Sequence, residues 1–96
     1  MRPSEIVQKY RADIVSIATA NHVCNVRLFG SVARGDDTDG SDLDLLVDPT
    51  SETTLMDIAR MQNRLRQLLG MPVDVVTPKA LPSRFRATVL AEAVPV

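Results

Sequence analysis

The sequence predicts an α/β (α+β) fold in which helices flank a small mixed three-stranded sheet. Three short runs of β-branched and apolar residues, each followed closely by glycine or proline, predict the strands. Longer segments around them repeat apolar residues every three or four positions, which is typical of amphipathic helices. A chain of 96 residues can bury one modest core, so we expect a single domain spanning residues 1–96.

The first expected elements are a helix and a strand. Pro3 suits the first turn of a helix and Ser4 can cap it. One apolar stripe continues from there to Ala18, so we expect a single helix that ends before Asn21-His22. Residues 23–29 carry β-branched and apolar side chains with one charge, and they predict a buried or half-buried strand.

The segment after this strand is expected to turn twice before a second strand begins. Residues 31–34 can form one helical turn, capped by Ser31 and stopped by Gly35. The run Asp-Asp-Thr-Asp-Gly at residues 36–40 is typical of a turn. Residues 42–47 then predict the second strand.

The second half of the chain predicts a helix, a third strand and a last helix. Residues 55–69 show the clearest amphipathic pattern, with Asp57 on the polar side, and Gly70 ends the helix. Residues 72–76 predict the third strand, and residues 80–93 a last helix.

Composition excludes several classes of protein. No apolar run approaches the roughly 20 residues that span a bilayer, so no membrane association is expected. Aromatic residues make up 3% of the chain and the net charge is −1, which argues against direct binding of nucleic acid. Cys24 is the single cysteine, which excludes an internal disulfide and a cysteine-based zinc site. We therefore expect an intracellular, cytoplasmic protein.

Acidic residues are concentrated in one segment. Six of the twelve acids lie within residues 36–48, whereas residues 60–86 hold six basic residues and one acid. This polarity favours a cation site that faces a basic surface, although a solvated loop beside a solvated helix would produce the same pattern.

Gly30 and Ser31 form a candidate anion site. A strand that ends in Gly-Ser and passes at once into a helical turn exposes unpaired backbone N–H groups, and glycine lets a ligand approach them closely. The Ser31 hydroxyl adds a donor, and Arg34, one turn further on, can add positive charge against a phosphate chain. The alternative is a turn glycine followed by a capping serine, with no ligand.

Three acids form a candidate metal site. Residues two apart in a strand point to one face, so Asp42 and Asp44 present their carboxylates together. Two such charges about 5 Å apart repel by roughly 3 kcal/mol at an effective dielectric of about 20, which favours a shared cation or one protonated carboxyl. Asp74 completes a triad if the third strand lies beside the second. Hard oxygen ligands in this arrangement suit Mg²⁺.

Each acid also has a simpler interpretation. Asp42 and Asp44 can face water near a strand end, and Asp74 can be an edge-strand acid that faces solvent or pairs with an arginine. Coordinates that place the three carboxylates on different sides of the sheet, or too far apart to touch common cations, would contradict the enzymatic interpretation.

The order of these features resembles the DNA polymerase β-type nucleotidyltransferase superfamily. The matching residues are Gly30-Ser31, then ten residues, then Asp42-Leu43-Asp44 and the distal Asp74. The small size and the strings Gly-Ser-Val-Ala-Arg-Gly and Ser-Asp-Leu-Asp-Leu resemble the minimal nucleotidyltransferases. These are commonly the antitoxins of two-gene modules with a HEPN-domain toxin. The resemblance covers nearly the whole chain in element order and implies a polymerase β-like nucleotidyltransferase core.

The resemblance implies a role for each motif residue. Gly30 and Ser31 would hold the triphosphate of ATP, with Arg34 and Ser41 also in the nucleotide site. The three acids would bind two Mg²⁺ ions, and Asp74 would help to remove the proton from the acceptor hydroxyl. The implied reaction transfers AMP from ATP to a hydroxyl group and releases pyrophosphate.

The acceptor is expected to come from a partner protein. Catalysis by positioning needs the acceptor about 3–3.5 Å from the reacting atom, and this chain has little surface to hold both a nucleotide and a small acceptor. The resemblance implies that the partner is the HEPN toxin and that a tyrosine hydroxyl receives AMP, which would block RNA binding by charge and size. Two alternatives remain: an antitoxin that neutralises its toxin by binding alone, and an aminoglycoside-type transferase for a small molecule.

Overall fold

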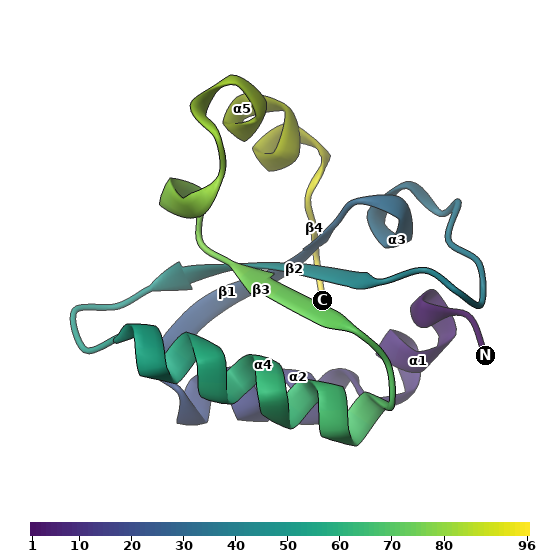
Figure 1. The fold of residues 1–96 in the computed structure, drawn as a ribbon, viewed down its shortest axis with the longest axis horizontal. Helices are drawn as coiled ribbons and strands as arrows, with labels where there is room; N and C mark the ends of the chain where they lie inside the picture. Colours follow the sequence, from purple (N-terminus) through teal and green to yellow (C-terminus); the bar gives the residue numbers. More distant parts are fainter.

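The strands form one mixed sheet in the order β3-β2-β1-β4 (Figure 1). The computed structural model describes residues 1–96. β1 (Val23–Phe29) pairs antiparallel with β2 (Leu43–Pro49) and with β4 (Val94–Pro95), while β2 pairs parallel with β3 (Val73–Val76). The predicted class and the three predicted strands are confirmed, with one difference: β2 begins at Leu43, so Asp42 lies in the loop before the strand and not within it as predicted. β4 is an additional fourth strand, and its two residues, one of them proline, are too few to show an alternating pattern.

Helices cover one face of this sheet. α1 (Pro3–Lys9), α2 (Arg11–Ala20) and α4 (Leu55–Leu69) lie on that face, whereas α3 (Ser31–Arg34) and α5 (Ser83–Glu92) lie on the other side (Figure 1). Apolar side chains from the sheet and from the covering helices are buried between them. The fully buried ones are Ile14, Leu43, Leu45, Val47, Met61, Leu65 and Val73.

The first predicted helix is in fact two helices. The chain breaks at Tyr10, whose φ of −108° and ψ of 19° lie between α1 and α2. No glycine or proline marks this break, and for that reason the apolar stripe predicted one continuous helix. α1 begins at Pro3 as expected, but the predicted cap at Ser4 is wrong. Because Arg2 is the N-cap residue, Ser4 lies inside the first turn, and its N–H donates to Asp37 Oδ2 at 2.9 Å.

α4 has the bounds that the sequence predicts because its end signals are local. The Thr54 hydroxyl accepts the Asp57 N–H at 3.2 Å, Asp57 Oδ2 accepts the Thr54 N–H at 2.9 Å, and Gly70 ends the helix with a φ of 67°. The placement of Asp57 on the exposed side is wrong. Its side chain is buried, because the carboxylate also contacts His22 Nδ1 at 3.4 Å and accepts from Arg60 at 3.0 Å.

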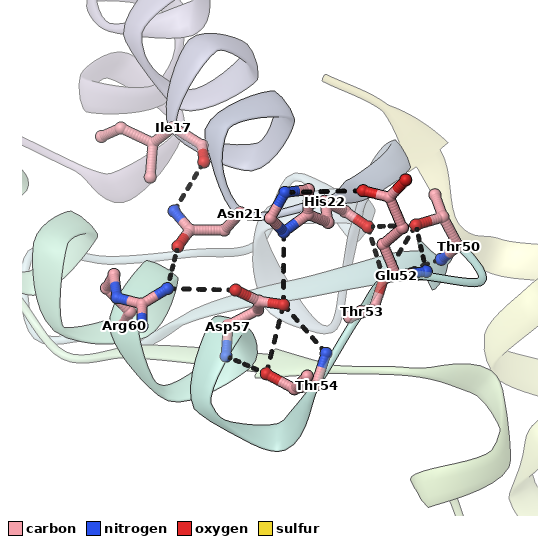
Figure 2. A network of polar contacts seen from close by, with 9 residues as sticks. All are labelled: Ile17, Asn21, His22, Thr50, Glu52, Thr53, Thr54, Asp57 and Arg60. Atoms are coloured by element: carbon pink, nitrogen blue, oxygen red, sulfur yellow. Dashed lines mark hydrogen bonds and ion pairs between the residues drawn. The ribbon is translucent and has the colours of Figure 1, made fainter.

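The polar network around Asp57 lies at the end of the sheet where β1 begins and β2 ends (Figure 2). The peptide oxygen of His22 accepts from the hydroxyls of Thr50 and Thr53, and the Asn21 amide donates to the Ile17 oxygen at 2.8 Å. These contacts join the end of α2 to the loop before α4. Gly30 and Asp44 lie at the opposite end of the β1–β2 pair, so this network is not part of the candidate site.

The last predicted helix is confirmed as α5, which is held by polar contacts and buries no side chain. At its start, Arg86 donates to the Pro78 and Leu81 oxygens at 2.8 and 3.0 Å, next to a short 3₁₀ helix, η1 (Pro78–Ala80). At its end, Glu92 accepts from Arg34 of α3 at 2.9 Å. No helix of the structure is both long and apolar enough to cross a membrane.

Candidate active site

The turn from β1 into α3 requires glycine at position 30. Gly30 is the N-cap residue of α3, with φ 75° and ψ −151°, a conformation that residues with a side chain rarely adopt. The helix has no side-chain cap, so the predicted capping role of Ser31 is wrong. Because nothing inside a helix accepts its first N–H groups, the corner leaves backbone donors free for an anion.

The Asp44 carboxylate lies directly against this corner. Phe29, the last residue of β1, pairs with Asp44 of β2. A Cβ atom added at Gly30 would come within 2.5 Å of Asp44 Oδ2. Gly30 and Asp44 of the sequence motif are therefore linked by geometry, because only a residue without a side chain leaves room for the Asp44 carboxylate at the end of β1.

The third acid lies on the neighbouring strand. β2 and β3 are parallel, and Asp44 is in register with Asp74, so both side chains emerge on the same face of the sheet. Leu43 and Leu45 alternate with Asp44 and are fully buried on the helix-covered face. The third strand therefore lies beside the second, which is the condition under which Asp74 could join Asp42 and Asp44.

The acids of this face interact electrostatically. The pKa of the Asp44 carboxyl is raised above its usual value, first by partial burial and then by the negative charges of Asp74 and Asp42. The positive charge of Arg34 opposes this rise, and no hydrogen bond to the Asp44 carboxylate offsets it. The surroundings of Asp44 therefore disfavour its ionised form, even with Arg34 nearby.

Asp74 also pairs with an arginine, as the simpler interpretation of this residue expected. Its side chain is 56% exposed on the edge strand, and its Oδ1 lies 3.5 Å from Arg66 Nη2. The Arg66 Nε–H donates to the Val73 oxygen at 3.0 Å, which fixes the guanidinium beside the strand. Nothing in the local sequence pattern shows which arginine would pair with Asp74.

Arg34 and Ser41, both expected in the nucleotide site, are engaged within the protein. Arg34 pairs with Asp36 at 3.3 Å and with Glu92 at 2.9 Å. The Ser41 hydroxyl accepts the Thr38 N–H at 2.9 Å and closes the turn before β2. The Glu92 contact could not be predicted from the sequence, because 58 residues separate Glu92 from Arg34.

The acids fit a divalent cation by their chemistry. Carboxylate oxygens are the hard ligands that Mg²⁺ prefers, and the raised pKa of Asp44 reflects a charge that a cation would neutralise. The side chains are not gathered for binding in this conformation. No group of three or more His, Cys, Asp or Glu side chains is arranged to hold a metal ion, and Asp74 is turned toward Arg66.

The sequence and the fold both match known proteins. A family model described as "Nucleotidyltransferase domain" matches residues 7–96. The chain belongs to this nucleotidyltransferase family. The resemblance noted in the sequence is confirmed, and the protein is a minimal nucleotidyltransferase of the polymerase β type.

Relatives support the same assignment of this nucleotidyltransferase. Protein adenylyltransferase MntA of Thermococcus cleftensis is 36% identical over 90 residues, covering 85% of this chain and 91% of MntA. A solved structure described as a minimal nucleotidyltransferase is 42% identical to this chain, with a TM-score of 0.86. The match covers 97% of this chain and 95% of the chain in that structure. The fold also matches a chain in a toxin–antitoxin crystal structure with AMP-PNP, at 20% identity and a TM-score of 0.74, over 88% of this chain and 69% of that one.

Proposed function

We propose that this nucleotidyltransferase transfers AMP from ATP to a tyrosine hydroxyl of a partner HEPN-domain toxin and thereby neutralises the toxin. The observation that carries the proposal is the position of Asp44, which lies against the Gly30 corner on one side and in register with Asp74 on the other. Backbone N–H donors of the corner and acidic side chains thus meet where β1 ends and β2 begins. The relative named a protein adenylyltransferase and the toxin–antitoxin structure with AMP-PNP support the same chemistry.

The nucleotide would bind with its triphosphate at the Gly30-Ser31 corner. Backbone N–H groups of the first turn of α3 and the Ser31 hydroxyl are the donors there. Asp42, Asp44 and Asp74 would hold two Mg²⁺ ions, which supply the positive charge that phosphoryl chemistry requires. Arg34 donates to Asp36 through Nε and to Glu92 through Nη1, so its Nη2 group is the one that can contribute to phosphate binding. Ser41 holds the turn that precedes Asp42.

The acceptor hydroxyl would approach from the exposed side of β3. Its oxygen forms a bond to the α-phosphorus, the bond from that phosphorus to the bridging oxygen breaks, and pyrophosphate leaves with the bonding electrons. The proton of the hydroxyl would pass to the Asp74 carboxylate, whose side chain is 56% exposed on the edge strand β3. A partner that presents its hydroxyl here supplies the positioning that this small chain cannot provide alone.

The test is transfer of AMP to a HEPN-domain toxin that forms a complex with this protein. The purified toxin is incubated with this chain, ATP and Mg²⁺, and its intact mass and tyrosine peptides are measured. We expect added AMP on tyrosine with the wild type and with D39N, because Asp39 is 79% exposed. D44N should form the complex but reduce transfer by at least about 100-fold.

Two outcomes would contradict the proposal. If the toxin gains no mass and is still neutralised, or if D44N neutralises as well as wild type, the chain acts by binding alone. If AMP appears on a small molecule in the absence of any partner protein, the acceptor class is wrong.

A further inference from the structure

We propose that Asp37 is a positioning residue whose buried carboxylate fastens the metal-ligand loop to the first turn of α1. The metal-ligand loop is residues 36–42, which joins α3 to β2 and carries Asp42 at its end. This role rests on the proposed function, because it concerns how the Asp42 carboxylate is held for a metal ion.

The contacts of Asp37 reach a part of the chain far away in sequence. Its Oδ2 accepts the Ser4 N–H at 2.9 Å, and its Oδ1 accepts from Arg2 Nη2 at 3.1 Å. Ser4 is in the first turn of α1, where backbone N–H groups have no partner within the helix. Asp37 therefore caps α1 from 33 residues away, and the positive end of the helix stabilises its charge.

Burial distinguishes Asp37 from the other acids of the loop. Its side chain is fully buried in its pair with Arg2, whereas Asp36 and Asp39 are 61% and 79% exposed. A buried carboxylate destabilises a fold unless hydrogen bonds and an opposite charge compensate it. Here the compensation is complete, since the bonds from Ser4 and Arg2 hold the pKa of the Asp37 carboxyl below its usual value despite burial.

The loop is fixed on both sides of this contact. Before it, the Asp36 N–H donates to the Ser31 oxygen at 3.1 Å. After it, the Ser41 N–H donates to the Thr38 oxygen at 3.0 Å and the Ser41 hydroxyl accepts the Thr38 N–H. The turn of residues 38–41 is thus closed by its own hydrogen bonds. Its links to the start of the chain are the buried Asp37 contacts with Arg2 and Ser4 and an exposed pair between Asp39 and the Met1 amino group at 3.3 Å. Asp42 follows the turn directly, so a shift of the turn would also move Asp42.

Asp37 has no place among the motif residues and does not touch the open face of the sheet. Its effect on catalysis must therefore act through Asp42. Groups that orient metal ligands from outside the coordination sphere typically change metal affinity or activity by about 10–100-fold when they are removed.

The first measurement is amide hydrogen exchange in the metal-free protein. In D37A the amides of Thr38 and Ser41 should exchange at least about 10-fold faster than in the wild type, because the turn loses its attachment to α1. R2Q removes one of the two contacts and should give a smaller increase. D39N is the comparison variant, since it removes the same charge from the same loop together with an exposed pair between Asp39 and the Met1 amino group at 3.3 Å, and it should speed exchange at both amides much less than D37A.

The second measurement is metal binding well below the melting temperature. Mn²⁺ affinity, and the Mg²⁺ concentration for half-maximal AMP transfer to the toxin, should both weaken by about 10-fold or more in D37A and remain unchanged in D39N. R2Q should weaken both quantities in the same direction by a smaller factor. If D37A does not fold, R2Q still tests the positioning role.

The outcomes separate this inference from the proposed function. If the wild type transfers AMP and neither D37A nor R2Q changes the Mn²⁺ affinity, Asp37 only stabilises α1 and the positioning role is overturned. If exchange at residues 38–41 does not respond to D37A or R2Q, the attachment itself is overturned. If the wild type neither binds Mn²⁺ nor transfers AMP, the proposed function fails and the positioning role fails with it.

Discussion

At the level of single residues, Asp44 lies in surroundings that disfavour its negative charge. It is half-buried between a glycine corner and a second acid, with a third acid nearby and no hydrogen bond to its carboxylate. Such an arrangement destabilises the ionised form, so the fold retains it at a cost that a bound cation would remove. A residue whose charge the metal-free fold disfavours is thus one that the proposed chemistry needs.

The raised pKa of Asp44 predicts a pH-dependent stability with a definite sign. Below the ordinary aspartate pKa of 3.8 the carboxyl is protonated in both the folded and unfolded chains. As pH rises toward the raised native pKa, the unfolded chain ionises first and the native state loses stability relative to it. In metal-free protein the melting temperature of D44N should therefore increase relative to wild type as pH rises from about 4 to about 7.

D39N, which removes the same charge at an exposed site, corrects for net charge in this comparison. Adding Mg²⁺ should stabilise the wild type and leave D44N nearly unchanged. If the difference in melting temperature between D44N and wild type stayed constant with pH, the raised pKa of Asp44 would be contradicted.

Gly30 gives a second prediction for a single residue. G30A should lower the free energy of unfolding by about 1–3 kcal/mol, because alanine is strained at a φ of 75°. Its Cβ would also displace the Asp44 carboxylate, so nucleotide transfer should be lost as well. G40A is the matched control, since a Cβ at Gly40 meets no atom within 4 Å and that glycine has no positive φ. Equal melting temperatures and activities for the two variants would be inconsistent with this geometry.

For secondary-structure elements, the sequence predicts what is encoded locally. α4 is predicted to the residue because Thr54 and Gly70 bracket an amphipathic repeat. The break at Tyr10 is not predicted, because tyrosine is neither a helix breaker nor a strong cap. β4 depends on pairing with β1 across about 65 residues of chain, and a two-residue segment carries no pattern of its own.

The same distinction applies to the candidate site. Gly30, Ser31, Asp42 and Asp44 lie within fifteen residues, and a spaced motif reveals them. Asp74 could be proposed because a charge interrupts an apolar strand. The contacts of Arg66 with Asp74, Glu92 with Arg34 and Asp37 with α1 could not be predicted, because each joins elements whose relative position only the folded chain determines.

Packing of α4 against the sheet gives a prediction for this element. Leu65 is fully buried in the core, whereas Leu68 on the same helix is 39% exposed. L65A should destabilise the protein by about 2–5 kcal/mol, because it leaves a cavity under β2 and β3. L68A should cost less than about 1 kcal/mol. Urea unfolding of the two variants measures the difference, and similar midpoints would show that α4 does not pack as described.

On the scale of the whole molecule, the two faces of the sheet differ in role. One face is packed against α1, α2 and α4 and carries the core (Figure 1). The other carries Asp44 and Asp74 and is bordered by α3 and α5, of which α5 buries no side chain. A protein built in this way has a stable scaffold on one side and an incomplete site on the other, which agrees with an acceptor that a partner supplies.

Two buried carboxylates should determine how the whole molecule responds to acid. Asp37 and Asp57 both have a lowered pKa because hydrogen bonds and opposite charges favour their ionised forms. A lowered native pKa gives stability that is present above the ordinary value of 3.8 and is lost as pH falls toward the native value. D37N and D57N should therefore be less stable than wild type near neutral pH, and the difference should shrink below about pH 3. Urea unfolding midpoints across this pH range measure the difference in stability between each variant and wild type. A difference that grew in acid would contradict the lowered pKa values of Asp37 and Asp57.

The central claim is that a nucleotide binds where the Gly30 corner meets the acids of β2 and β3. A crystal structure of this chain with Mg²⁺ and the ATP analogue AMP-PNP tests it most directly. We predict the triphosphate at Gly30 and Ser31, metal density between Asp42, Asp44 and Asp74, and an Asp74 side chain that has left Arg66. A nucleotide bound elsewhere, for example in the cavity of about 170 Å³ beside Arg60 and Arg64, with the acids arranged as they are here, would contradict the account.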